Sequence, residues 1–122
     1  MITNTESGTN IHEIGKGIYR INTPVALPGG AGQFNFNQYL VIDDEPLMFH
    51  TGQRALFPLV SEAVRAVLPL EKLRYLALSH FEADECGALN EFLAAAPNAV
   101  PVCGQVAALV SEIGRASCRE RV

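Results

Sequence analysis

The chain has 122 residues, 48% of them hydrophobic and 18% charged, so it is long enough for one domain with a core and too apolar for global disorder. Its net charge of −4 disfavours nucleic acid and anionic membrane surfaces as partners. No apolar run reaches the roughly 20 residues that span a bilayer, and residues 1–10 contain no basic side chain, unlike a signal peptide. Three widely spaced cysteines do not form a disulfide framework. We therefore expect a cytoplasmic protein.

The first half of the chain predicts antiparallel strands. Residues 11–14 and 18–23 alternate apolar and polar side chains on either side of a glycine-rich turn, which predicts a pair of strands. Residues 25–35 contain a proline and several glycines and are expected to form a flexible loop. Two apolar runs, 38–42 and 46–50, lie on either side of three consecutive acidic residues and predict a hairpin.

The second half predicts alternating helices and strands. Residues 56–68 have apolar side chains at helical spacing. Residues 73–78 and 99–102 are short continuous apolar runs, typical of buried strands. An Ala- and Leu-rich helix is expected between them at 87–96, and a third helix at 105–110. This order predicts an α/β fold with a mixed sheet and helices packed on one face.

Three segments differ in composition. Residues 1–10 form a polar lead-in, expected to be frayed. Residues 11–112 form the domain. Residues 113–122 carry three arginines and resemble an in-frame translation of a short-read sequencing adapter. We therefore expect the natural frame to continue past Glu112 to roughly double the length; the alternative is an ordinary basic, exposed tail.

A cluster of potential metal ligands follows the strand expected at 73–78. His80, Glu82 and Asp84 stand at alternate positions, and in extended backbone such side chains point to one side. No Lys or Arg lies among these acidic residues, so a cation would relieve their mutual repulsion. The alternatives are that Asp84 or Glu85 caps the following helix and that His80 is a structural residue at a strand end.

The motif His80-x-Glu82-x-Asp84, followed by Gly87, resembles the first metal-ligand motif of the metallo-β-lactamase fold, in its flavodiiron-type, oxygen-binding di-iron branch. The order of elements over about residues 11–111 agrees with this family. The resemblance implies the N-terminal half of a metallo-β-lactamase-like αββα sandwich. It also implies that His80 and Glu82 ligate one metal and Asp84 a second.

Two iron ions are the expected cofactor of the full-length protein, with zinc as the alternative. Hydrolases of this fold usually have His where Glu82 stands, and a carboxylate-rich site favours iron. Glu85 and His50, at the end of the strand expected at 46–50, are candidate outer-sphere residues; for His50 the alternative is a structural role. No histidine follows His80, so the remaining ligands that the resemblance implies are not in this chain.

Three functional hypotheses follow. The first is a fragment of a binuclear non-haem iron protein that binds or reduces dioxygen or nitric oxide. It would take electrons from a flavin or rubredoxin-type protein and allow a homodimer at full length. The second is a zinc hydrolase acting on esters or thioesters. The third is an inactive truncated domain, so whether this chain is itself an enzyme stays open.

Overall fold

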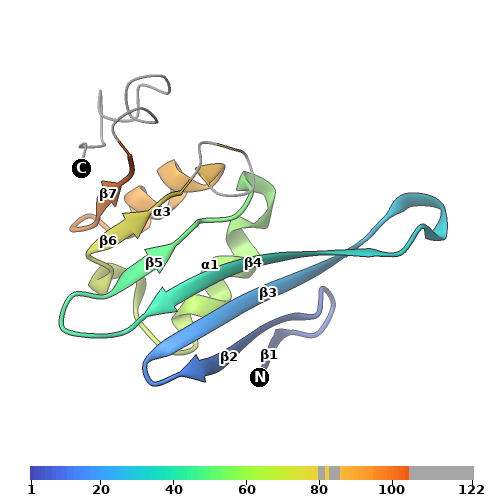
Figure 1. Cartoon of the computed structure of the whole chain (residues 1–122), viewed down its shortest axis with the longest axis horizontal. Coiled ribbons are helices and arrows are strands. Elements are labelled where there is room, and N and C mark those ends of the chain that lie inside the picture. Colours follow the sequence, from blue (N-terminus) through green and yellow to red (C-terminus); the bar gives the residue numbers. More distant parts are fainter. Residues whose placement is uncertain (80–81, 83–85, 105–122) are drawn as a thin grey trace.

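The computed structural model describes residues 1–79, 82 and 86–104. They form a mixed seven-stranded sheet whose strands lie side by side in chain order (Figure 1). Neighbours are antiparallel from the first strand to the fifth and parallel from the fifth to the seventh, which confirms the predicted mixed sheet. The strands are β1 (Ile2–Asn4), β2 (Thr9–Gly15), β3 (Ile18–Ala26), β4 (Gln33–Val41), β5 (Leu47–Phe49), β6 (Tyr75–Ala77) and β7 (Val100–Val102).

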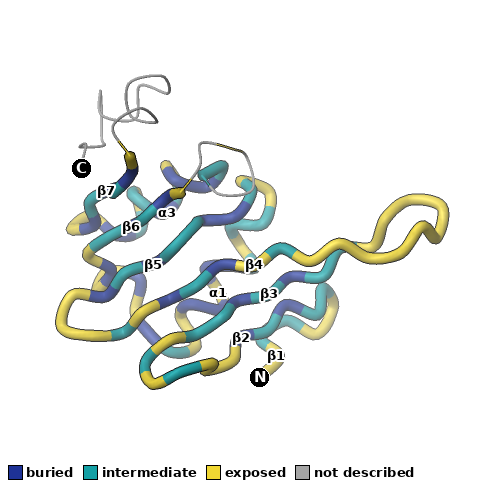
Figure 2. The backbone as a smooth tube through the Cα atoms, in the orientation of Figure 1, coloured by how far each residue is buried: buried dark blue, intermediate teal, exposed yellow. Residues whose placement is uncertain are grey.

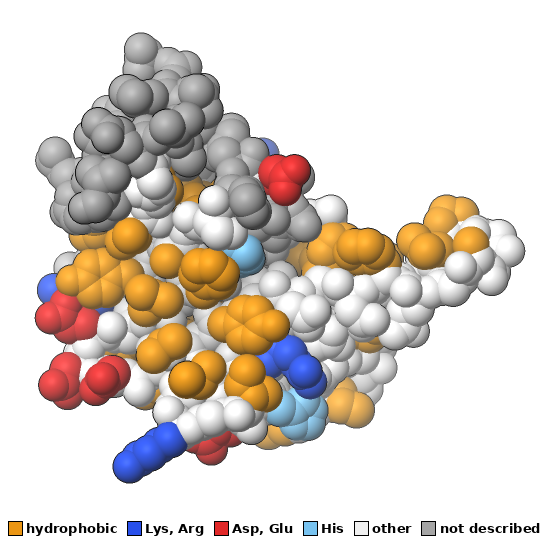
Figure 3. Space-filling view, viewed as in Figure 1, with side chains coloured by type: hydrophobic (Ala, Val, Ile, Leu, Met, Phe, Trp, Pro, Cys, Tyr) orange, Lys and Arg blue, Asp and Glu red, His pale blue; other side chains and the backbone are white. Residues whose placement is uncertain are grey.

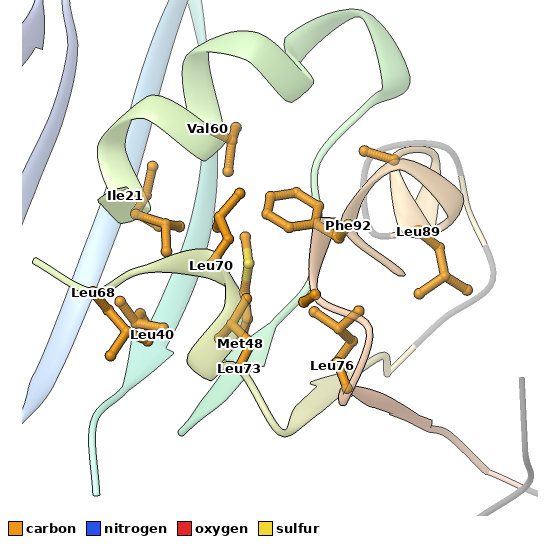
Figure 4. Packing of buried hydrophobic residues seen from close by; sticks show 14 of the residues in the cluster. Ile21, Leu40, Met48, Val60, Leu68, Leu70, Leu73, Leu76, Leu89 and Phe92 are labelled. Atoms are coloured by element: carbon orange, nitrogen blue, oxygen red, sulfur yellow. The ribbon is translucent and has the colours of Figure 1, made fainter. Parts of the chain in front are cut away.

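Among the described residues, two helices cover one face of this sheet. Helix α1 (Phe57–Arg65) connects β5 to β6, and helix α3 (Leu89–Ala95) connects β6 to β7. Alternate strand residues point toward the helices, and at the centre of the sheet these residues are fully buried (Figure 4). The core they form with the helices contains Ile21, Leu40, Met48, Leu76, Val60, Ala63, Val64 and Phe92.

The other face of the sheet carries no helix among the described residues. Its central side chains are also apolar, and Figure 3 shows them gathered over β4, β5 and β6. We call this surface the open face. The strand registers place its side chains in cross-strand pairs: Ile18 with Val41, Val41 with Leu47, Leu47 with Tyr75, and Tyr39 with Phe49.

The N-terminal segment is not a frayed lead-in, and that prediction is wrong. Ile2–Asn4 forms β1 and pairs with β2. The Met1 ammonium donates to the Ile11 carbonyl at 3.0 Å, and the buried Thr9 and Thr23 hydroxyls are 3.1 Å apart. These contacts join residues far apart in sequence, so composition alone does not reveal them.

The loop expected over residues 25–35 is too long at both ends, because only residues 27–32 lie between the two strands. β3 continues to Ala26 and β4 begins at Gln33, and a 3-10 turn, η1 (Pro28–Gly30), joins them. Residues 24–37 therefore form a two-stranded hairpin, here called the arm, that projects from the sheet and is largely exposed (Figure 2). Prolines and glycines at the tip close the turn instead of loosening the segment.

The helices predicted at 56–68 and 87–96 are present but shorter, as α1 and α3. Two 3-10 turns, η2 (Arg54–Leu56) and η3 (Leu70–Lys72), take up residues on either side of α1. The helix expected at 105–110 lies outside the described residues. Among those that are described, no helix has the length and apolar character needed to cross a membrane.

Candidate metal-binding site

The candidate site lies at the edge of the sheet where β5 and β6 end. These strands are parallel and paired in register, so their C-terminal ends are side by side. The His50 amide donates to the Ala77 carbonyl at 2.8 Å, which extends the ladder one residue beyond β5. On the β7 side, the Leu78 amide donates to the Val102 carbonyl at 2.9 Å. Both contacts fix the chain just before the predicted ligand segment.

His50 occupies a strained position at this edge. Among the described residues it is the non-glycine residue with positive φ, at 69°, a conformation that costs roughly 1–2 kcal/mol for an L-residue. Its Nε2 lies 2.7 Å from the Ser79 hydroxyl and accepts from the Ser79 amide at 3.4 Å. The ring also stacks on Phe49, with 4.2 Å between ring centres. The turned backbone thus carries the imidazole to the residue that precedes His80.

The two residues after His50 hold the other end of the ligand segment. The buried Thr51 hydroxyl accepts from the Ala88 amide at 3.2 Å, and that amide also donates to the Gly52 carbonyl at 3.0 Å. Ala88 precedes helix α3. The segment between Ser79 and Ala88 is therefore tied at both ends to the three residues that follow β5.

Gly52 is required by this arrangement. Its φ is +83°, and a Cβ there would lie 3.0 Å from Gln38 Nε2 and 3.5 Å from Val60 Cγ2. The strand expected at 46–50 ends before Thr51 and Gly52, and the sequence pattern assigned these two residues no role. A Thr-Gly pair directly after an apolar run was the available signal, but its partner, Ala88, is distant in the sequence.

Glu82 is the one predicted ligand that the structure describes. It is exposed, and its backbone carbonyl accepts from the Cys86 amide at 2.9 Å and from the Cys86 thiol at 3.2 Å. The carboxylate is therefore open to solvent while the backbone is held. His80, Asp84 and Glu85 lie outside the described residues. Within residues 1–79, 82 and 86–104, no group of three His, Cys, Asp or Glu side chains could hold a metal, so the ligand set stays a prediction.

A buried amide beside this site was missed by sequence reasoning. The Gln38 side chain is fully buried, and its Oε1 and Nε2 have no hydrogen-bond partner among the described residues. An unsatisfied buried amide costs about 1–3 kcal/mol. Gln38 is the first residue of the run 38–42, where the sequence pattern marks it as an ordinary residue at the start of a strand. Only the close approach of Gly52 shows its special environment.

Comparison with known proteins supports the fold described above. The sequence profile described as ODP family beta lactamase matches residues 34–117. Comparison with curated protein sequences gives no significant match.

Among solved structures, the chain is similar to a flavodiiron core from Synechocystis sp. PCC6803, with a TM-score of 0.78, 19% identity, and coverage of 93% of this chain and 31% of that one. It is also similar to rubredoxin oxygen:oxidoreductase from Desulfovibrio gigas, with a TM-score of 0.77, 20% identity, and coverage of 93% and 30%. A metallo-β-lactamase from Cronobacter sakazakii is also similar, with a TM-score of 0.68, 18% identity, and coverage of 87% of this chain and 34% of that one.

These likenesses confirm the predicted fold, the N-terminal part of a metallo-β-lactamase-like sandwich. The chain spans about a third of the length of these three structures. The family profile extends five residues past Glu112, from 113 to 117; the adapter origin of the tail and the domain limits stay predictions.

Proposed function

We propose that this chain, which belongs to the ODP family of beta lactamases, contributes the first ligands of a binuclear non-haem iron site. In this proposal His80 and Glu82 bind one iron and Asp84 binds the second. The observation that carries it is the attachment of the ligand segment at both ends to the three residues after β5. A segment held at Ser79 and Ala88 has restricted freedom to reposition its ligands.

The donors present suit iron. The segment 79–86 contains an imidazole and three carboxylates and no Lys or Arg, and the exposed Glu82 carboxylate is available to a cation. Carboxylate and imidazole ligands are typical of non-haem iron sites. When bound, iron would supply one-electron redox chemistry, which zinc cannot.

His50 is proposed as a positioning residue. Its ring contacts Ser79 through the side chain and the amide, and Ser79 is bonded directly to His80 in the chain. Both contacts fit the tautomer with the proton on Nδ1, which leaves Nε2 as the acceptor. The strain at its φ of 69° is retained because the ring then reaches the ligand segment. Glu85 is proposed as a second outer-sphere group.

The proposed substrate and partner are suggested by the names of the similar proteins. One is named rubredoxin oxygen:oxidoreductase, and another a flavodiiron core. We propose that the whole protein binds or reduces dioxygen or nitric oxide and takes electrons from a flavin or rubredoxin-type protein. In this proposal the second sheet of the sandwich would pack on the open face, and that part of the protein would supply the remaining ligands.

Anaerobic titration of the 122-residue chain with Fe²⁺, followed by calorimetry, tests the site. His80→Ala should weaken iron binding by more than the roughly 10- to 100-fold that loss of an outer-sphere group costs, because a direct ligand is lost. His12→Ala removes an imidazole on β2 and is the matched control, expected to bind iron as the wild type does. Equal binding by the wild type and His80→Ala would overturn the assignment.

The choice of iron over zinc is tested at Glu82. The full-length protein purified without added metal should contain mainly iron. Glu82→His in that protein should shift the metal content toward zinc. Glu82→Gln keeps the side-chain size and controls for loss of charge. Stoichiometric zinc in the wild type, together with thioester hydrolysis and no oxygen uptake after reduction, would contradict the iron-protein hypothesis. It would support the zinc-hydrolase hypothesis instead.

A further inference from the structure

Gln38 combines complete burial with an amide that has no partner. Its side chain is 0% exposed, and neither Oε1 nor Nε2 is hydrogen-bonded among the described residues. The buried threonines differ from it: the Thr9 and Thr23 hydroxyls lie 3.1 Å apart, and the Thr51 hydroxyl accepts from the Ala88 amide. Because an unsatisfied buried amide lowers stability, core packing alone does not explain a glutamine at this position.

The place of Gln38 in β4 puts it beside the candidate metal site. β4 pairs with β5 as far as Tyr39 and Phe49, and Gln38 is the first residue beyond that pair. Continuation of the same register would place His50 opposite Gln38, but His50 turns out of the strand with its φ of 69°. Gln38 therefore stands where the chain turns away from β4 into residues 50–52, here called the 50–52 turn.

The Gln38 amide lies directly against this turn. A Cβ on Gly52 would lie 3.0 Å from Nε2 and 3.4 Å from Cδ of Gln38, so the absence of a side chain at Gly52 lets the amide come this close. Gly52 also takes part in holding the ligand segment, because its carbonyl accepts from the Ala88 amide and from the Thr51 hydroxyl. A small movement of Gly52 therefore changes both the surroundings of the Gln38 amide and the place of Ala88.

We propose that Gln38 is a positioning residue for the metal-ligand segment and acts through Gly52. An unpaired amide gains a hydrogen bond whenever main-chain groups of the 50–52 turn come within reach, so it attracts the turn toward β4. The turn carries Ala88, and with it one end of the ligand segment. This inference rests on the proposed function. It explains why the chain keeps a residue that lowers its stability: the lost stability restricts the position of the ligands.

Two measurements on one variant of the 122-residue chain separate this role from a structural one. Gln38→Met keeps the length of the side chain and removes both polar atoms. In the presence of a chelator it should raise the midpoint of urea unfolding. In the anaerobic titration it should weaken Fe²⁺ binding about tenfold, the lower end of the range for an outer-sphere partner. A residue with a merely structural role would change stability and affinity in the same direction, and that result would overturn the inference.

Leu40→Met is the matched control for the titration. Leu40 is buried on the same face of β4, two residues along, and receives the same new side chain at nearly constant volume. It should bind iron as the wild type does. If Gln38→Met also binds iron as the wild type does while His80→Ala does not, this inference is wrong and the proposed function stands. If the wild type binds iron no more tightly than His80→Ala, both are wrong.

NMR of the wild type follows the Gln38 side chain without any substitution. Zn²⁺ serves as a diamagnetic probe of the ligand segment. Saturating Zn²⁺ should shift the Gln38 side-chain NH₂ resonances and slow their exchange with solvent, because a restrained turn pairs with the amide for more of the time. Gln33, exposed on the same strand, is the internal control and should not change. Unchanged Gln38 resonances in the Zn²⁺-saturated chain would overturn the inference.

Discussion

The two faces of the sheet are both apolar at their centre, but they are stabilised differently. On the face covered by α1 and α3, Leu40 and Met48 are fully buried. On the open face, Val41, the next residue along β4, is 36% exposed and lies opposite Ile18 and Leu47 in the neighbouring strands. Apolar composition therefore does not distinguish a finished core from a surface that needs a cover. What distinguishes them is whether a second layer is present.

The largest expected effect is on the covered face. Leu40→Ala should lower the free energy of unfolding by about 3 kcal/mol, because it leaves a cavity between the sheet and the helices. Val41→Ala, one residue away on the open face, should cost less than about 1 kcal/mol. Urea unfolding followed by circular dichroism measures both. Equal costs would show that the open face is as well packed as the core.

Gly52 and Gly30 both have a positive φ but differ in whether an added Cβ would meet other atoms. Gly52→Ala should destabilise the protein by about 2 kcal/mol, because the positive φ and the close Gln38 amide both oppose a Cβ. Gly30, in the arm, has a similar φ of +71°, but no atom lies within 4 Å of a new Cβ. Gly30→Ala therefore measures only the cost of the positive φ and should lower the free energy of unfolding by about 1 kcal/mol. If both variants lose the same stability in urea unfolding, the contact with Gln38 contributes nothing.

Gln38 is a polar exception on the covered face. Gln38→Met keeps its length and removes two unpartnered atoms, so it should raise the free energy of unfolding by about 1 kcal/mol. The shift of the urea midpoint at constant slope measures it. A loss of stability instead would mean that the native amide is satisfied, for example by a bound water.

The smallest stability effect is expected on the open face. Val41→Lys should change the free energy of unfolding by about 0.5 kcal/mol or less but should reduce aggregation, because it interrupts an exposed apolar patch. Light scattering during a thermal ramp measures aggregation. The wild type should aggregate during heating before it shows a sharp unfolding transition. A wild-type monomer that unfolds cooperatively without light scattering would show that the open face needs no cover.

The sequence by itself determined the elements that depend on local chemistry. Alternation predicted β2 and β3, and two apolar runs around three acidic residues predicted the β4–β5 hairpin. Helical spacing predicted α1, and short apolar runs predicted the buried strands β6 and β7. The order of these elements, with the motif at His80, was also enough to indicate the family.

Only the tertiary structure decided the features that join distant residues. Strand β1 exists because Met1 and Ile2 meet β2 across a turn, and the arm stays extended because each strand supplies the other's partners. The positive φ of His50, its contact with Ser79 and the hold of Thr51 on Ala88 follow from the parallel placement of β5 beside β6. Such contacts depend on register between strands, and register is fixed by packing of the whole sheet, so no local pattern encodes it.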